Sequence, residues 1–570
     1  MSIWIKKSSR RLALSVSLVT CLGTLAGVSQ SWAFSSKDGI EVDLEYDGKV
    51  ALPSPSLVPA KDGVPAHPET LTSDEQVQLQ LTFLSGAFQN NPVQGGRRTD
   101  DTAVITREDK NFIYYHYKGK ALLDNKVGNH YPFTLPRDPK TVYQASVNPD
   151  GKVPCTDPHY QGAGDYFYFW NPTARGCRLQ KERDYFEITA DVKRLPDAPQ
   201  TFPDYSRLID KNGEITIHVL MGKNEDKTTR KPVFSFDDSA PTFKQYDALL
   251  KKEKFSAKTL SKNEILHMMA VQPEGKEVYY KKLPYIREYE KTEGGVKVKI
   301  RYFYGNVSAA DDSGPMHFFW KDAIEHASVA IYSGHSGLGW NLKPEMIQEE
   351  LGEFNVDPYR YQIWVLDGCS TYTYYQQPYF QVKASKMTDK DKLDRLDPKA
   401  NLQIISAALE SGITYNAATP LEMTTAILAY LRHKDAPNWK TLAGRMSHEN
   451  LIAVSGDEMA PDTVDGRYIR NIEMVAPIEP TLIVPPLKTT LPVQLTPLVL
   501  APAPVGEIPL DAEDLEEIKK MQEEDAATGA TDDAPAQDTP SEEAAPAEAH
   551  SPGIHSLGDY VPEFAKRYFK

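Results

Sequence analysis

The chain has few cysteines, only one long hydrophobic run and no concentration of basic side chains. It has 4 cysteines in 570 residues, too few for a fold that depends on a dense disulfide framework. Lysine and arginine total 64 against 79 acidic side chains, and no basic patch is present, so we expect no nucleic-acid partner. Outside the first 33 residues, no stretch is apolar for long enough to span a bilayer, and no internal repeat is evident.

The amino end has the pattern of a secretory signal peptide. Four cationic residues precede an apolar run over residues 12–28, and the small residues of Ser31-Trp-Ala33 follow. This order predicts a signal peptide over residues 1–33 and a mature start near Phe34. We therefore expect an exported protein that is periplasmic, outer-membrane-associated or secreted. A lipoprotein signal at Cys21 and an uncleaved anchor are the alternatives.

Composition divides the remaining chain into five segments. The acidic segment is the clearest, because residues 501–550 carry 15 acidic and 2 basic side chains, which favours disorder. We expect an extended linker over 34–70, a β-rich domain over 71–205, an α/β domain over 206–475, a Pro-rich and then acidic disordered linker over 476–550, and an aromatic tail over 551–570. The β-rich domain could be an inhibitory pro-region or a binding module. The tail could dock on a partner, on the cell envelope or on its own domain.

One cysteine remains as a thiol once the signal peptide and one expected disulfide are accounted for. Cys21 would leave with the signal peptide, and three cysteines would remain in an oxidising compartment. Cys155 and Cys177 lie 22 residues apart, and we expect them to form a disulfide. Cys369 is then the remaining thiol and a candidate reactive group, unless it is buried and inert.

Two short motifs in mid-chain place a histidine and a cysteine at equivalent positions, each just after a predicted strand. Val329–Ser333 and Gln362–Asp367 are apolar and aromatic runs that each stop at a glycine, as buried strands that end in a loop do. His335 follows the first run, Cys369 follows the second, and a helix is expected between them. Adjacent parallel strands joined by a crossover helix have their carboxyl ends side by side. The two side chains are therefore predicted to share one edge of a sheet.

The flanking segments alternate between strand and helix patterns. This alternation predicts an α/β/α sandwich with a mainly parallel sheet. Strands are expected over 214–221, 296–304, 329–333, 362–367 and 401–409, and helices over 242–252, 315–327, 344–354 and 420–432.

A thiol beside an imidazole can do acyl-transfer chemistry. A thiolate is a strong nucleophile, and a nearby imidazole can raise the thiolate fraction or protonate a leaving amine. Backbone N–H groups in the turns at Gly334–Gly337 and Gly368–Cys369 could hold the developing oxyanion. The alternatives are a buried structural cysteine with an unrelated histidine, and a zinc site, although further zinc ligands close in sequence are missing. We expect no metal and no cofactor.

These two motifs resemble the paired motifs of the caspase-like cysteine peptidases, among them the metacaspases, gingipains, clostripain and legumain. Tyr332-Ser-Gly-His335 and Asp367-Gly-Cys369-Ser carry the resemblance. It implies a caspase-like fold and a cysteine endopeptidase with a Cys369–His335 dyad acting on a protein or peptide substrate. It also implies oxyanion donors in a loop that includes Ser336, Gly337 and Gly368, and an acidic pocket at Asp367 that favours Arg or Lys before the cut bond.

Two features leave other functions open. Ser336 stands where the family usually has glycine, so a catalytically inactive caspase-like protein that serves as an envelope scaffold is the main alternative, with a thioester-using transferase as a third. The lysine-rich stretch 383–399 is either a solvated loop or a self-cleavage site. Its aspartates do not match a calcium-loop pattern, so calcium is implied only by analogy with the family.

Overall fold

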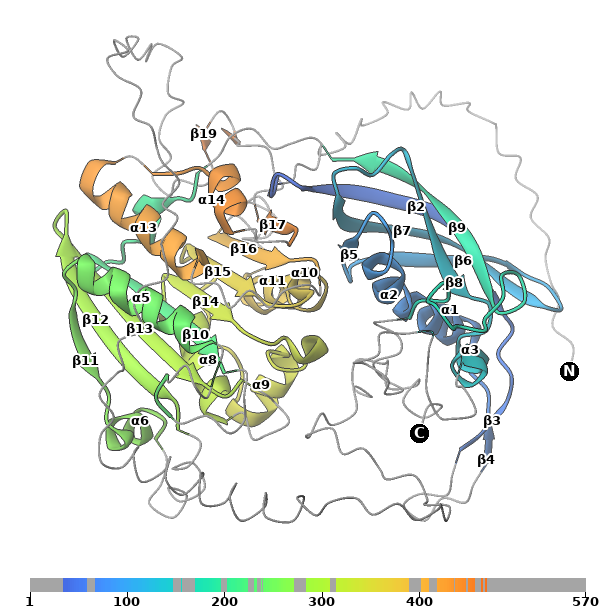
Figure 1. Cartoon of the computed structure of the whole chain (residues 1–570), viewed down its shortest axis with the longest axis horizontal. Coiled ribbons are helices and arrows are strands. Elements are labelled where there is room, and N and C mark those ends of the chain that lie inside the picture. The colour runs from blue at the N-terminus through green and yellow to red at the C-terminus, as the bar shows by residue number, and fades with distance from the viewer. Residues whose placement is uncertain are drawn as a thin grey trace, which may run out of the picture. The chain divides into compact units, whose positions relative to one another are not determined.

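The computed structural model describes residues 34–58, 67–146, 155, 170–195, 202–223, 230–232, 237, 239–270, 283–307, 314–388, 401–409, 418–434, 436–446, 450–456, 463–464 and 467–468 (Figure 1). The expected signal peptide, the linker and tail beyond residue 475, and most of the expected self-cleavage stretch lie outside these ranges. Among the helices of the described part, none has the length and apolar character needed to cross a bilayer.

Nine strands form the larger sheet, in the order β1-β17-β16-β15-β14-β10-β13-β12-β11. The central strands from β16 to β13 are parallel, whereas β17 and β1 on one flank and β12 and β11 on the other pair antiparallel. The sheet is therefore mixed, and the expectation of a mainly parallel sheet is wrong at both flanks. The strands are β1 (Phe34–Ser35), β10 (Glu214–Gly222), β11 (Ser256–Thr259), β12 (Tyr285–Glu293), β13 (Val296–Gly305), β14 (Val329–Ser333), β15 (Gln362–Asp367), β16 (Leu402–Ala407) and β17 (Ile452–Ser455).

One antiparallel flank arises from a hairpin. Gly294 and Gly295 join β12 to β13, and both have positive φ angles, 57° and 82°. Two successive left-handed residues form the turn that matches the twist of paired strands. By contrast, β14 is buried at every position and β15 at all but its last, which fits central parallel strands covered on both faces.

Helices cover both faces of this sheet (Figure 1). On one face, Phe243 and Ile427 pack in a core cluster with Ile217 of β10. On the other face, Trp320 and Tyr379 belong to the cluster that contains Leu366 of β15. The mixed α/β architecture is thus confirmed. The first face carries α5 (Ala240–Lys252), α13 (Ala418–His433) and α14 (Trp439–Met446); the second carries α8 (Gly314–His326), α9 (Pro344–Leu351) and α11 (Gln376–Ala384), while α6 (Lys262–Met268) and α10 (Thr371–Tyr374) are shorter.

A second, antiparallel sheet has six strands and confirms a β-rich amino-terminal region. Its path is β5-β7-β2-β9-β8, and β6 pairs with β7. The elements are β2 (Gly39–Ala51), β5 (Gly95–Arg97), β6 (Thr102–Glu108), β7 (Phe112–Asp124), β8 (His130–Pro136) and β9 (Tyr185–Arg194), with α1 (Ser73–Thr82), α2 (Leu84–Gln89) and α3 (Pro139–Ser146). Small two-stranded sheets pair β3 (Ser56–Val58) with β4 (His67–Glu69), and β18 (Thr463–Val464) with β19 (Arg467–Tyr468).

The expected linker over 34–70 is wrong in its first part. Strand β2 pairs with β7 along its whole length and also with β9, so this region begins at Gly39 and not at residue 71. The cause is local, because apolar Ile40, Val42, Leu44 and Tyr46 alternate with acidic residues. That alternation buries one face of a strand and exposes the other.

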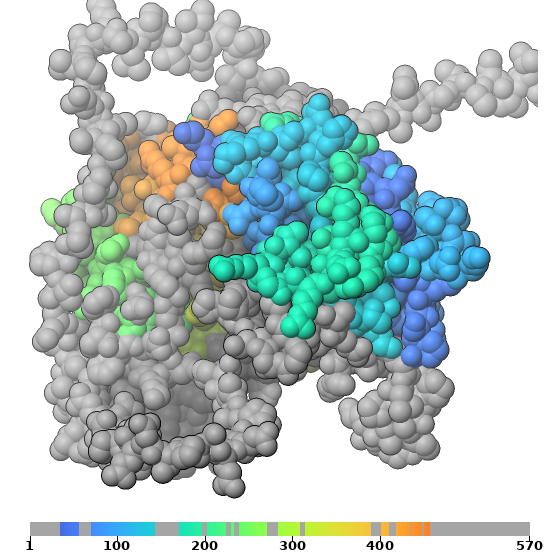
Figure 2. Space-filling view, turned by 45° about the vertical axis from the view of Figure 1, so that its right-hand side comes forward, coloured from blue at the N-terminus to red at the C-terminus, as the bar shows by residue number. Residues whose placement is uncertain are grey.

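The amino-terminal segment connects the two sheets. Phe34 pairs with Val454 at the edge of the nine-stranded sheet, and the chain then enters β2 of the six-stranded sheet. Figure 2 shows blue atoms of the amino-terminal region beside the orange atoms of the carboxyl-terminal elements. A buried cluster that contains Leu122 of β7, Tyr372 of α10 and Leu451 joins the two regions.

The predicted disulfide is confirmed. Cys155 and Cys177 are bonded, with their Cα atoms 4.7 Å apart. Cys155 is buried in the amino-terminal core with Trp170. Cys369, the third cysteine beyond the expected signal peptide, is not disulfide-bonded.

Candidate functional site

The exits of β14 and β15 touch each other. Ser333 and Asp367 are register partners in this parallel pair, and the Gly334 N–H donates to the Asp367 carbonyl at 3.0 Å. A Cβ atom on Gly368 would lie 2.5 Å from the Gly334 carbonyl oxygen, so only glycine permits this approach. His335 and Cys369 each follow one of these glycines directly. The expected side-by-side strand exits are confirmed at the level of the main chain.

Glycines extend this contact along the carboxyl edge of the sheet. Gly222 of β10 is the register partner of Gly305 of β13, and its Cα lies against Gly334. The row Gly305, Gly222, Gly334 and Gly368 therefore crosses four neighbouring strands without side chains. All four glycines are buried, and Val307 packs against Gly222 and Gly334. The row includes the point between β10 and β14 where the order of the parallel strands reverses.

The loop that carries His335 is held by three polar side chains. The His335 carbonyl accepts from the Tyr332 hydroxyl and from Asn341 Nδ2, the latter at 2.8 Å. The next carbonyl, that of Ser336, accepts from the Tyr375 hydroxyl at 2.6 Å. These bonds fix the main chain on both sides of the histidine.

The loop that carries Cys369 is fixed from its other end. Ser370, the next residue, has the left-handed backbone φ of 47°, and its N–H donates to the Leu409 carbonyl at 3.2 Å. Thr371 Oγ1 donates to the Leu366 carbonyl at 2.6 Å and accepts from the Ala407 N–H at 2.9 Å. The cysteine is therefore held between β15 and a helix start that is tied to both β15 and β16.

Both loops contain non-glycine residues in a left-handed conformation. Leu338 has a φ of 51°, three residues after His335, and Ser370 directly follows Cys369. Such conformations cost about 1–3 kcal/mol each and persist where the surroundings determine them. They are typical of sites that are held in place for function.

Tyr332 lies close to both loops. Its hydroxyl bonds the His335 carbonyl. Burial raises the pKa of Tyr332 well above 10, the Asn341 bond lowers it, and the charge of a Cys369 thiolate raises it further. The hydroxyl therefore stays protonated and able to donate.

The other predicted site residues lie in the same two loops. The hydroxyl of Ser333 donates to Asp367 Oδ2 at 3.3 Å, and the Asp367, His335 and Cys369 side chains are each partly exposed. Ser336 and Gly368 are buried, whereas Gly337 is exposed. Within the described ranges, the N–H groups of Ser336, Gly337 and Gly368 donate no hydrogen bond. They remain available as donors.

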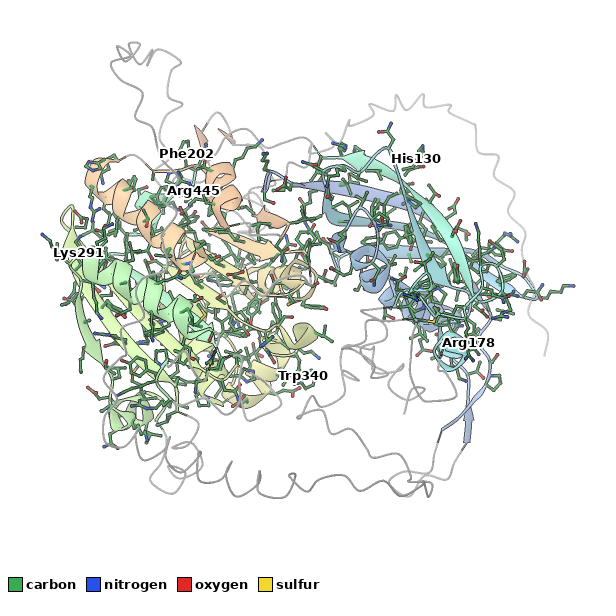
Figure 3. The ribbon with its side chains drawn as sticks, viewed as in Figure 1. His130, Arg178, Phe202, Lys291, Trp340 and Arg445 are labelled. Atoms are coloured by element: carbon green, nitrogen blue, oxygen red, sulfur yellow. A yellow bond between two sulfur atoms is a disulfide. The ribbon has the colours of Figure 1, made fainter. Side chains whose placement is uncertain are left out.

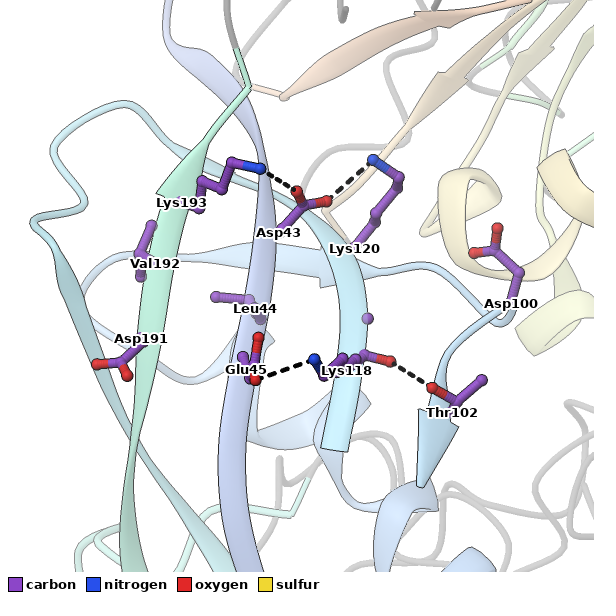
Figure 4. A pocket seen from close by; sticks show the side chains of 11 residues that line it. Asp43, Leu44, Glu45, Asp100, Thr102, Lys118, Lys120, Asp191, Val192 and Lys193 are labelled. Atoms are coloured by element: carbon purple, nitrogen blue, oxygen red, sulfur yellow. Dashed lines mark hydrogen bonds and ion pairs between the residues drawn. The ribbon is translucent and has the colours of Figure 1, made fainter. Parts of the chain in front are cut away.

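No group of three or more His, Cys, Asp or Glu side chains among the described residues could hold a metal ion. A surface groove of about 470 Å³ lies elsewhere, on the polar face of the six-stranded sheet (Figure 4). Its lysines face its acids, with Lys120 3.0 Å and Lys193 3.7 Å from Asp43. This groove contains none of the predicted site residues.

Sequence reasoning missed the residues that hold the two loops. Tyr332 was assigned to a strand and to the motif that carries the resemblance, but without a role of its own. Asn341 and Tyr375 carried no signal that separates them from ordinary polar and aromatic residues. Trp340, in the same loop as Asn341, is partly exposed (Figure 3). The glycine row did have a signal, because each of its four strands ends at a glycine or directly before one.

Comparison with known proteins gives no relative. No family model, no curated protein and no solved structure matches the chain.

Proposed function

We propose that the protein is an exported cysteine endopeptidase of the caspase-like type, with Cys369 as nucleophile and His335 as its partner. One observation carries the proposal. The main chains of Gly334 and Gly368 are in contact at the carboxyl edge of two adjacent parallel strands, and each of the two residues comes next. Ligand sites of open α/β sheets lie at this edge.

The order of the parallel strands supports the fold assignment. In chain order they are β10, β13, β14, β15 and β16, and they lie in the sheet as second, first, third, fourth and fifth. This is a doubly wound order whose crevice lies between the first and third strands. In the proposed enzyme, the peptide binds at the carboxyl edge of β14 and β15, where His335 and Cys369 are partly exposed.

The proposed chemistry is acyl transfer to sulfur. The Cys369 thiolate attacks the scissile carbonyl carbon and forms a C–S bond, while N–H groups at Ser336, Gly337 or Gly368 donate to the oxyanion. The C–N bond then breaks, and the leaving amine takes a proton from His335. Water cleaves the thioester, which releases the new carboxylate and returns the thiol.

Asp367 is proposed to favour a basic side chain before the cut bond. A carboxylate can accept several hydrogen bonds, and Ser333 supplies one at 3.3 Å. A partly exposed carboxylate next to the nucleophile's loop could therefore pair with the guanidinium of Arg or the ammonium of Lys.

A panel of fluorogenic peptides with Arg, Lys, Asp or Asn before the reporter tests the proposal. We expect cleavage after Arg or Lys, and a loss of about a thousandfold or more in Cys369→Ala. Asp367→Asn should weaken the preference for Arg and Lys more than it lowers total turnover.

The alternative is a scaffold protein without activity, favoured by the buried serine at position 336. Equal turnover of wild-type and Cys369→Ala protein on every peptide would exclude the peptidase. Absence of turnover, together with equal and slow alkylation of Cys369 in wild-type and His335→Ala protein, would favour the scaffold.

A further inference from the structure

We propose that the β-rich region is a permanent part of the catalytic unit, and that Gln89 is a positioning residue for the loop that carries Cys369. The role of Cys369 as nucleophile rests on the proposed function, whereas the contacts that hold its loop do not depend on that function. The sequence left two roles open for the β-rich region, an inhibitory pro-region or a binding module. A pro-region must be removed before the enzyme acts, and a binding module need not contact the nucleophile's loop. The inference assigns the β-rich region neither role, but that of a fixed support for this loop.

Gln89 reaches across from the last turn of α2. Its Nε2 donates to the Ala408 carbonyl at 2.7 Å and to Ser370 Oγ at 3.1 Å. In its own region it also donates to the Gly95 carbonyl at 3.2 Å. One amide thus ties β5 of the smaller sheet to the end of β16 and to the residue after Cys369.

Ser370 needs this support because of its backbone. A non-glycine residue in the left-handed region is strained, and Ser370 has a φ of 47°. Its own hydroxyl donates to the Ala408 carbonyl at 3.3 Å, the same oxygen that Gln89 binds. Loss of Gln89 would remove one of the bonds that hold this conformation, so the direction in which Cys369 leaves the strand would be less fixed.

A buried ionic network lies beside this contact. The Tyr372 hydroxyl donates to Glu41 Oε1 at 2.5 Å, and Arg98 Nη1 lies 3.8 Å from the same oxygen. Glu41 and Arg98 are only 3% and 2% exposed. Burial and the neighbouring Glu41 carboxylate raise the pKa of Tyr372 well above 10, so the phenol remains a donor.

Separation of the two regions would break the hydrogen bond between Tyr372 and Glu41. It would also expose the Glu41–Arg98 ion pair, both of whose members belong to the amino-terminal region. The apolar cluster of Leu122, Tyr372 and Leu451 would be exposed as well, and β1 would leave the edge of β17. The interface is thus built like the interior of one domain.

The test compares Gln89→Met with Gln76→Met. Methionine matches glutamine in length and cannot donate. Gln76 is the control, because its Nε2 donates to the Ala51 carbonyl at 3.1 Å within the same region but away from Cys369. Thermal unfolding, hydrogen exchange of the peptide 366–375 and alkylation of Cys369 by iodoacetamide are measured for both variants, together with kcat and KM on the best reporter.

We expect Gln89→Met to speed exchange in 366–375 several-fold, to change the alkylation rate of Cys369 and to lower kcat roughly tenfold with little change in KM. Gln76→Met should alter only the unfolding temperature. Equal exchange and alkylation in the two variants would overturn the inference. If wild-type protein cleaves nothing but Gln89→Met still loosens 366–375, the proposed function fails and the positioning role stands.

A second arm tests permanence. A specific protease site is inserted between Leu195 and Phe202 of the full chain, and the cut protein is passed through a sizing column. We expect the two halves to elute together and Cys369 to keep its alkylation rate. Release of the amino-terminal half with unchanged or faster alkylation would show a removable pro-region and contradict the inference.

Discussion

At the scale of single residues, the molecule holds its candidate site through main-chain bonds to neighbouring side chains. Tyr332, Asn341 and Tyr375 bond the carbonyls of His335 and Ser336. The His335 and Cys369 side chains are partly exposed, while the residues that hold their loops are buried. This division is what a preorganised site requires, because a catalytic group placed 1 Å away from its position can lose about a hundredfold in rate.

The substitution Tyr332→Phe tests this support. It removes the hydroxyl that donates to the His335 carbonyl, and we expect a loss of about 1 kcal/mol in the free energy of unfolding and roughly a tenfold lower kcat. Urea unfolding and reporter turnover measure the two effects.

The control for Tyr332→Phe is Tyr302→Phe on strand β13, which β10 separates from β14. The Tyr302 hydroxyl is buried and has no hydrogen-bond partner in the described part of the chain. Its removal should leave stability unchanged or slightly higher and leave kcat unaffected. Equal effects of the two substitutions would mean that the Tyr332 hydroxyl does not hold the histidine loop.

His218 on β10 predicts acid sensitivity of the larger sheet. Burial, then the positive charges of Arg301, His326 and Arg360, lower the pKa of His218 well below 6.5. The Asp322 carboxylate lies 3.4 Å from His218 Nδ1, but it also pairs with Arg301 at 2.7 Å. The folded protein keeps this side chain neutral, while the unfolded chain binds a proton as the pH falls through 6.5. Stability should therefore fall below pH 6.5, by up to about 1.4 kcal/mol per pH unit.

The measurement is urea unfolding at several pH values for wild-type and His218→Gln protein. Glutamine does not titrate, so the variant should lose less stability on acidification than the wild type. Parallel curves for the two proteins would contradict the assignment.

At the scale of elements, contacts tie parallel strands together at both edges of the larger sheet. The glycine row joins the carboxyl ends of β13, β10, β14 and β15, and Lys383 of α11 joins the amino ends of β15 and β16. Its ammonium donates to the Arg360 carbonyl at 2.5 Å, to Gln362 Oε1 at 3.0 Å and to the Asn401 carbonyl at 3.1 Å. Burial lowers the pKa of Lys383 well below 10.5, and the three oxygens around its nitrogen offset the cost of burying this polar group.

Lys383→Met should weaken the larger sheet. The substitution keeps the length of the side chain but leaves three buried acceptors without their donor, so we expect a loss of about 3 kcal/mol or more in the free energy of unfolding. Lys386→Met, one turn further on, removes only a surface ion pair with Glu353 and should change stability by less than about 1 kcal/mol. Similar losses in both variants would show that Lys383 is not a structural tie.

Sequence patterns predicted the central elements well, because β14, β15 and β16 are buried apolar runs, β10 and β13 alternate before turning apolar, and the helices between them have clear periodicity. They failed at β2, where proline-rich residues nearby outweighed a plain alternation of apolar and acidic side chains. They also failed at β12, whose pairing depends on the turn at Gly294 and Gly295. Composition over a long window conceals such local signals.

Some residues of the candidate site could likewise be predicted from sequence patterns, and others could not. His335 and Cys369 could be found because each ends a strand, and the register of two adjacent strands follows from their apolar runs. Gln89 could not be found, because it meets Ser370 across 281 residues of sequence. A contact of that kind is set by the packing of two sheets, which periodicity within one segment does not reveal.

At the scale of the whole molecule, three features connect the two sheets: an apolar cluster, a buried ionic network, and strand β1, which pairs with β17 just before the chain enters β2. Phe34, the first residue of β1, is also the predicted start of the mature chain. Cleavage after Ala33 would therefore leave a terminus that is already part of the larger sheet, and export would produce a molecule complete in its fold.

Sequencing the amino terminus of protein recovered from an expressing bacterium tests this expectation. We expect the mature chain to begin at Phe34 and to be found outside the cytoplasm, because residues 1–33 have the order of a signal peptide. An intact Met1, or a start at a lipid-modified Cys21, would contradict it.

The rate of Cys369 alkylation by iodoacetamide, measured from about pH 5 to about pH 9 in wild-type and His335→Ala protein, tests the central claim most directly. A thiol beside an imidazole should react with a midpoint below the usual thiol pKa of about 8.5, and the variant should lose that shift. Coinciding profiles, or a sulfur that reacts in neither protein, would contradict the proposed dyad.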